Sequence, residues 1–98
     1  MAFISLYTSM QGLTIEDFRT VSAKHNPPQD IDGLLVWTAG TDENGLHVVT
    51  IWESRAHAER FQAEQLFPAF QATGMMTAVV DNSTQVTFDT DEIYVRSQ

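Results

Sequence analysis

The sequence predicts one α+β domain over residues 1–98, with its strands and helices in the ferredoxin-like order βαββαβ. The chain has 98 residues, enough for one domain and too few for two. Strand-like and helix-like segments form two similar halves, each strand–helix–strand. Asn44-Gly45, a strong hairpin signal, joins the two central strands. This order predicts an antiparallel sheet with both helices on one face.

The first half begins with a predicted strand at residues 2–8, which contains aromatic and β-branched residues and no breaker. Thr14 precedes two acidic residues and resembles a helix N-cap. Three- and four-residue steps then predict a helix that reaches Lys24 or His25, through the following positions: Ile15, Phe18, Val21, Ser22 and His25. Pro27 and Pro28 end this helix. A strand is predicted at 34–39.

The second half begins with a predicted strand at 46–52, and Ser54 is a plausible N-cap for the helix that follows. Pro68 lacks a backbone donor, so this helix is expected to kink or restart near Phe67 before Gly74 closes it. Residues 75–83 favour neither type of element. The segment 85–95 is strand-like around 86–88 and 93–95.

Both faces of the central hairpin are predicted to be buried. In residues 34–39 and 46–52 the two alternating sets of side chains are both largely apolar, whereas a sheet with one hydrated face shows a polar set. The two predicted helices cover one face only. A homodimer that buries the second face is therefore expected.

Composition excludes several classes of function. Thirteen acidic and five basic residues give a formal net charge of −8, which disfavours nucleic acids and anionic membranes as partners. The chain has no cysteine, so zinc–thiolate sites and thiol nucleophiles are excluded. The three histidines have no metal-site spacing, and no cofactor or metal is predicted. The apolar N-terminus lacks a signal peptide's basic residues, so a cytoplasmic protein is expected.

The segment from Gly45 to Phe70 carries the sequence Ile51-Trp52-Glu53-Ser54, a helix with Phe61, and then Leu66-Phe67-Pro68-Ala69-Phe70. It resembles the dimeric α/β-barrel superfamily, in the branch of antibiotic-biosynthesis monooxygenase-like domains. This resemblance implies a dimeric barrel. It also implies either cofactor-independent oxidation of an aromatic, polyketide-like substrate or the binding of haem or another small ligand.

The resemblance also bears on individual residues. The tryptophan of the quinone-forming monooxygenases that matches Trp52 lines the pocket. An asparagine four residues before it corresponds to Val48 here, and the histidine of the haem-degrading relatives corresponds to Gln62. The known catalytic groups of both branches are therefore replaced in this chain. Either a cofactor-independent monooxygenase or a non-catalytic ligand-binding or accessory dimer fits the sequence.

The candidate catalytic residues are Trp52, His25 and Tyr7, and the candidate substrate-pocket residues are Trp37, Val48, Phe61 and Met75. Trp37 and Trp52 are predicted to share one face of the hairpin, where an indole stacks on an aromatic ligand or simply fills the core. His25 ends the apolar stripe of the first helix, and a structural histidine is its plainer interpretation. Tyr7 offers a hydroxyl to a ligand oxygen.

The remaining polar residues receive other expectations. Tyr94 and Arg96 are weaker candidates for a ligand oxygen, and Met76 joins Met75 as a possible lining of the pocket mouth. His47 is expected on the face of the partner sheet, and His57 in solvent at the start of the second helix. Acidic side chains near turns predict a solvated rim, comprising Asp42, Glu43, Asp89, Asp91 and Glu92.

Overall fold

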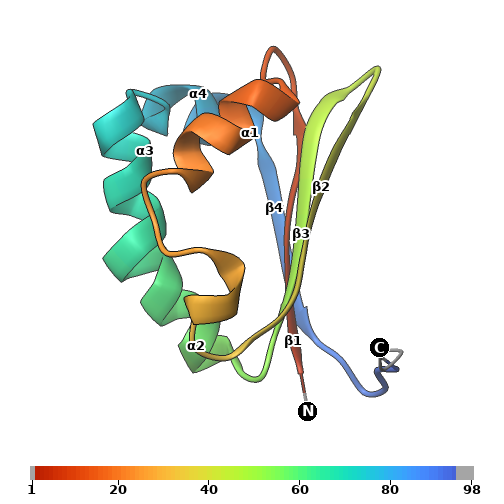
Figure 1. The fold of residues 1–98 in the computed structure, drawn as a ribbon. Coiled ribbons are helices and arrows are strands. Elements are labelled where there is room, and N and C mark those ends of the chain that lie inside the picture. Colours follow the sequence, from red (N-terminus) through yellow and green to blue (C-terminus); the bar gives the residue numbers. More distant parts are fainter. Residues whose placement is uncertain (1, 95–98) are drawn as a thin grey trace.

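The structure is a computed structural model that describes residues 2–94. A four-stranded antiparallel sheet has the order β2-β3-β1-β4, and the helices pack against one of its faces (Figure 1). The strands are β1 (Phe3–Met10), β2 (Leu34–Asp42), β3 (Gly45–Trp52) and β4 (Thr84–Asp89). This arrangement confirms the predicted α+β, ferredoxin-like fold with its helical layer on one face.

The helical layer contains two elements that the sequence did not predict, η1 and α4. It comprises α1 (Ile15–Ser22), a 3-10 turn η1 (Pro28–Asp30), α2 (Arg55–Phe61), a π-helical turn η2 (Gln62–Leu66), α3 (Phe67–Thr73) and α4 (Met76–Asn82). The ambiguous residues 75–83 therefore form mainly a helix. Val79 of α4 is buried in the core cluster around Phe70. Tertiary packing therefore determines that this segment is helical, because its local sequence signals are weak.

The ends of α1 follow from local hydrogen bonds. Thr14 and Asp17 form a capping box, in which the Thr14 hydroxyl accepts from the Asp17 N–H and the Asp17 carboxylate accepts from the Thr14 N–H. The helix ends at Ser22 with Ala23 as its C-cap. The prediction that it continues to Lys24 or His25 is wrong, and His25 lies in the connection to η1.

Pro68 has the effect expected of it. The chain from Arg55 to Thr73 is helical, but it widens into the π turn η2 directly before α3, where the Phe67 N–H donates to the carbonyl of Gln62. Pro68 occupies the first turn of α3, where its missing N–H costs little. The predicted restart near Phe67 is confirmed.

Two irregularities correct the simple alternation of the strands. The register shifts between Leu34 and Val36, so Leu34 packs beside Trp37 against the core around Trp52. Leu35 is exposed. The expectation that Leu34 shares a face with Val36 is therefore wrong. A second shift lies between Tyr7 and Met10 of β1, where Ser9 has a positive φ of 58°.

The C-terminal strand is shorter than the strand-like pattern suggests. β4 ends at Asp89, and Ile93 and Tyr94 belong to no strand. Tyr94 is 81% exposed. Val95 and Arg96, which the sequence also brought into consideration, lie outside the described residues.

The face of the sheet opposite the helices is apolar. The strand registers bring together on it Ile4, Leu6, Val36, Val49, Ile51, Val86 and Phe88. None of these seven side chains is fully buried, and Val86 and Phe88 are exposed. Among residues 2–94, no helix covers this outer face (Figure 1). The observation agrees with the apolar patterning of both faces of the hairpin.

The hairpin turn gives a sharp test of the backbone. Gly45 has a φ of 105°, and a β-carbon there would lie 2.3 Å from the carbonyl oxygen of Met10. We expect Gly45→Ala to lower the free energy of unfolding by roughly 1–3 kcal/mol through strain and steric conflict. Gly40 in the same hairpin has ordinary φ, and a β-carbon added there would meet no atom within 4 Å, so Gly40→Ala is the control. Urea denaturation of both variants checks this, and equal midpoints would contradict it.

Candidate functional site

A cavity of about 70 Å³ lies between the inner face of the sheet and the helical layer. All seven candidate residues lie on its wall: Tyr7, His25, Trp37, Val48, Trp52, Phe61 and Met75. Most of the remaining wall is apolar, with the polar exceptions Ser5, Asp17, Ser22, Thr50 and Gln62. The fold thus brings together side chains that are distant in sequence around one apolar space, as in small-molecule sites.

An aromatic group forms one side of the cavity. The Phe61 ring of α2 lies 5.3 Å from the Trp52 ring and 5.9 Å from the Trp37 ring, measured between centroids. The His25 ring lies 5.1 Å from Phe61 and 5.3 Å from Trp37 in edge-to-face geometry. Trp37 and Trp52 therefore do point from one face of the hairpin, and these distances are typical of favourable aromatic pairs.

Trp52 is part of the wall but has no free polar group. It is 2% exposed, and its indole N–H donates to the Thr50 hydroxyl at 2.8 Å. The Thr50 hydroxyl in turn donates to the carbonyl of Ser5 at 3.2 Å. This chain of bonds ties β3 to β1, so the indole supplies apolar surface to the cavity while its donor is used within the sheet.

Tyr7, on β1, lines the sheet side of the cavity. Burial raises its pKa above the usual value of 10, so the phenol is neutral at physiological pH and retains its proton. Its oxygen accepts a long hydrogen bond of 3.3 Å from the side-chain amide of Gln85. The hydroxyl proton is therefore available to an acceptor oxygen, and Tyr7 is chemically a donor and not a base.

His25 has the geometry of a proton acceptor. Its Nδ1 lies 2.8 Å from the carbonyl oxygen of Asn26, and a carbonyl only accepts, so this nitrogen carries the proton. In the neutral imidazole, Nε2 at the other side of the ring then holds a lone pair. The adjoining loop is fixed because the Asn26 N–H donates to the side chain of Gln65 at 3.0 Å.

His25 also lies between two spaces. Besides the inner cavity, it lines an open groove on the surface, together with Ala23, Lys24, Asn26, Glu64, Gln65 and Pro68. The His25 side chain therefore borders both the apolar cavity and an open groove on the surface. This position, shortly after a helix end and against two aromatic rings, distinguishes His25 from the other two histidines.

The other pocket positions show what the cavity lacks. Val48 and Gln62 both line it, and these are the two positions at which the resemblance implies an asparagine and a histidine. Met75 lines the cavity, whereas Met76 packs against the neighbouring core cluster and is not on the wall. The sequence did not identify Ser22 as a cavity residue, but it lines the cavity. Its position on the apolar stripe of the first helix was a signal that it faces the interior.

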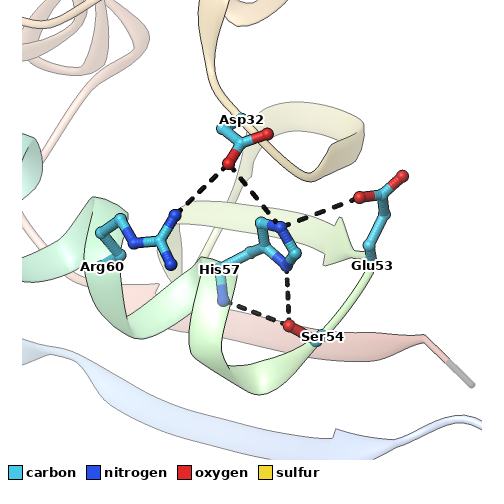
Figure 2. Close-up of polar contacts among 5 residues, drawn as sticks. All are labelled: Asp32, Glu53, Ser54, His57 and Arg60. Carbon is cyan, nitrogen blue, oxygen red and sulfur yellow. Dashed lines mark hydrogen bonds and ion pairs between the residues drawn. The ribbon is translucent and has the colours of Figure 1, made fainter.

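His57 belongs to a separate polar cluster, with Asp32, Glu53, Ser54 and Arg60 (Figure 2). Its Nδ1 lies 2.7 Å from the Ser54 hydroxyl, and its Nε2 lies 3.7 Å from Asp32 and 3.8 Å from Glu53. Its ring lies so close to Gly33 that a β-carbon there would be 2.3 Å away. The expectation of a solvated His57 is therefore wrong.

This cluster resembles a serine–histidine–aspartate arrangement only superficially. Ser54 is the N-cap of α2, and its oxygen accepts the His57 backbone N–H. Asp32 also pairs with Arg60 at 3.3 Å, and its carboxylate is largely exposed. None of the five residues lines the cavity. The cluster fixes the start of α2 to the loop before β2, and its exposed ion pairs contribute little to stability.

His47 lies on the outer face of the sheet, opposite in direction to Trp52, as expected. Its Nδ1 accepts from the Ser9 N–H at 3.1 Å, and its Nε2 donates to Asp42 at 2.7 Å. The bond from Ser9 lies at the β1 bulge, and the bond with His47 lowers the pKa of the Asp42 carboxyl. The five acidic residues of the predicted rim, including Asp42, are all exposed.

Within residues 2–94, no group of three potential ligands among His, Asp and Glu is placed to hold a metal ion. In the same range no helix is both long and apolar enough to cross a bilayer. The cavity also has no carboxylate cluster that would attract a cation, because Asp17 is engaged in the cap of α1.

No family model and no curated protein matches the sequence. Solved structures do match the fold. Rv0793 from Mycobacterium tuberculosis aligns over 96% of this chain and 97% of its own, with 12% identity and a TM-score of 0.61. A mutant of SnoaB from Streptomyces nogalater, described as a cofactor-independent oxygenase, aligns over 94% of this chain and 93% of its own, with 16% identity and a TM-score of 0.55.

These alignments cover almost the whole chain. They show that this chain shares its fold with Rv0793 and SnoaB. At such low identity the fold is all that is shared, so the role of each cavity residue must be argued from its own geometry.

The bonding of Trp52 predicts how its substitution acts. Trp52→Phe removes the donor to Thr50 and leaves a void in the core, so we expect the free energy of unfolding to fall by about 2 kcal/mol. The affinity for an aromatic ligand should change little, because the indole N–H is not free. Trp37→Phe, at a half-buried site, is the control with a smaller loss. Thermal midpoints and ligand titrations check this; an unchanged midpoint beside weakened binding would contradict it.

Proposed function

We propose that this chain binds an apolar aromatic molecule with an ionisable hydroxyl in the cavity, and that it oxidises this molecule with dioxygen without a cofactor. The observation that carries the proposal is the arrangement of the wall: it has an aromatic side for the substrate ring, and both Tyr7, a neutral phenol donor, and His25, whose neutral ring has an acceptor nitrogen, line the same cavity. The fold shared with SnoaB, a cofactor-independent oxygenase, supports it.

In the proposed reaction, His25 Nε2 removes a proton from the substrate and so makes it electron-rich. Tyr7 donates to the oxygen on which negative charge develops, at a site where an apolar wall strengthens the interaction. A methylene flanked by aromatic rings then reacts with dioxygen to give a carbonyl and water. The CH₂ group supplies all four electrons that dioxygen accepts, so the balance needs no further reductant.

The size of the cavity limits the substrate in the closed state. About 70 Å³ is less than half of the roughly 150 Å³ cavity that holds a benzene ring in a well-studied engineered protein. A larger substrate therefore requires wall side chains to move. Met75 is suited to this, because an unbranched thioether side chain adopts many rotamers at low cost.

A second function is a ligand-binding or accessory protein without turnover. Two observations favour it: Val48 and Gln62 stand where catalytic groups of related branches would stand, and the cavity is small. The proposals share the same site and differ in whether bound ligand is consumed.

A measurement of dioxygen uptake distinguishes the oxygenase from the ligand-binding or accessory protein. With a tricyclic anthrone-type substrate and a chelator present, we expect the protein to consume dioxygen, and His25→Gln to lower the rate about 100-fold or more through loss of the base. His57→Gln, which changes a histidine outside the cavity, is the matched control and should retain the rate per folded molecule. Binding without uptake by the unaltered protein would reject the oxygenase and favour the accessory function.

We also propose that residues 1–98 form one domain that pairs with a second copy through the outer face of the sheet. Seven apolar side chains from all four strands lie there, while the rest of the surface is rich in acidic groups. A flat apolar sheet face suits a self-complementary interface of the obligate, hydrophobic kind. Location in the cytoplasm stays an expectation from the sequence.

Sedimentation equilibrium tests this pairing. At tens of micromolar the protein should have twice the chain mass of 11.0 kDa, and Val49→Lys should shift it toward monomer, because a central charge would be buried without a partner. Val80→Lys is the control, since Val80 is 67% exposed on α4 in the helical layer. A monomeric unaltered protein, or equal effects of both substitutions, would refute the proposed interface.

A further inference from the structure

Ser22 is half-buried, but it has a buried hydroxyl oxygen that the proposed reaction does not yet use. It is the last residue of α1, and it lies on the wall of the cavity. Its hydroxyl oxygen is excluded from solvent and makes no hydrogen bond with any of the described residues. Burying an unpaired hydroxyl costs about 1–3 kcal/mol, so a missing partner requires an explanation.

Other polar side chains on the helices show the usual solution. Thr20 donates to the carbonyl of Glu16 at 2.9 Å, Thr73 to that of Ala69 at 2.9 Å, and Asn82 to that of Ala78 at 2.9 Å. Each uses the backbone of the preceding turn. Ser22 has the same local option and does not use it. Its hydroxyl is thus left without a partner, on a residue that lines the cavity.

The neighbourhood of Ser22 restricts the chemistry of that group. Val21 and Phe18, on the same helix, are apolar parts of the wall, and His25 follows one turn later with a lone pair on Nε2. A serine hydroxyl donates and accepts, whereas this histidine tautomer only accepts at Nε2. A ligand hydroxyl satisfies both, because it can donate to His25 and accept from Ser22. A carbonyl would leave the His25 lone pair unused.

We propose that Ser22 is the specificity-determining residue of the cavity, and that it binds the hydroxyl oxygen of a phenol or enol whose ring lies against the aromatic wall. This inference rests on the proposed function of the cavity and adds the class of ligand and its orientation. The ligand hydroxyl lies toward the end of α1, where His25 takes its proton. The hydrogen bond from Ser22 then stabilises the oxyanion that forms, as an oriented donor does in an apolar site.

Phenol and toluene form the matched probe pair, because they have the same number of heavy atoms and differ in the hydroxyl. Both are titrated by isothermal calorimetry into the unaltered protein, Ser22→Ala, Ser22→Thr and Thr20→Ala. We expect Ser22→Ala to weaken phenol about 3- to 10-fold, the range of one neutral hydrogen bond, and to leave toluene unchanged. Ser22→Thr keeps the hydroxyl and should restore phenol binding. Thr20→Ala, on the exposed side of α1, should affect neither probe.

A second measurement tests the unpaired state itself. Without ligand, Ser22→Ala should raise or maintain the thermal midpoint, because it removes an unsatisfied hydroxyl and introduces a better helix former. A lowered midpoint would show that Ser22 already has a partner and would overturn the inference.

The outcomes separate the two levels of the proposal. If the unaltered protein binds neither probe, the proposed function of the cavity fails, and the role of Ser22 with it. If it binds both and Ser22→Ala leaves the affinity for phenol unchanged, the cavity stands as a ligand site. The role of Ser22 is then overturned.

Discussion

The packing of one phenylalanine against three aromatic rings determines the relation between the sheet and its helices. Phe61 lies within 6 Å of the rings of Trp37, Trp52 and His25, which come from β2, β3 and the loop after α1. It thereby fixes the distance between the layers at one end of the cavity. Because protein cores are close-packed, a change at this contact would move α2 and the loop that carries His25 together, and with them the shape of the cavity.

The sheet supports this contact through its hydrogen bonds and its irregularities. The indole N–H of Trp52, bonded to Thr50, holds the ring in the orientation that meets Phe61. The bulge at Leu35 turns Leu34 toward the same core. The inner face of the sheet thus carries a packed aromatic wall beside the small cavity. The outer face, with its seven apolar side chains, has no such cover among residues 2–94, and this is the basis for the proposed pairing with a second copy.

Much of this could be predicted from local signals. Asn44-Gly45 indicated the hairpin register, and counting alternate residues from this turn placed Trp37 and Trp52 on one face. Pro68 indicated the restart of the second helix. The helix at residues 76–82 and the bulge at Leu35 were not predictable in this way, because long-range packing determines both. The ring of His57 lies on Gly33, a contact between distant segments that helix position alone does not indicate. Ser22 was visible on the apolar stripe, but only the structure shows that its oxygen has no partner.

In the proposed function, an aromatic hydroxyl compound binds in the cavity beside Phe61. The most direct measurement is a high-resolution crystal structure of the protein grown with 1-naphthol. We expect electron density for the rings of 1-naphthol between the aromatic wall and Met75. Its oxygen should lie within hydrogen-bond distance of both Ser22 Oγ and His25 Nε2. A cavity that contains only ordered water at saturating 1-naphthol, or a ligand found only on the outer face of the sheet, would contradict it.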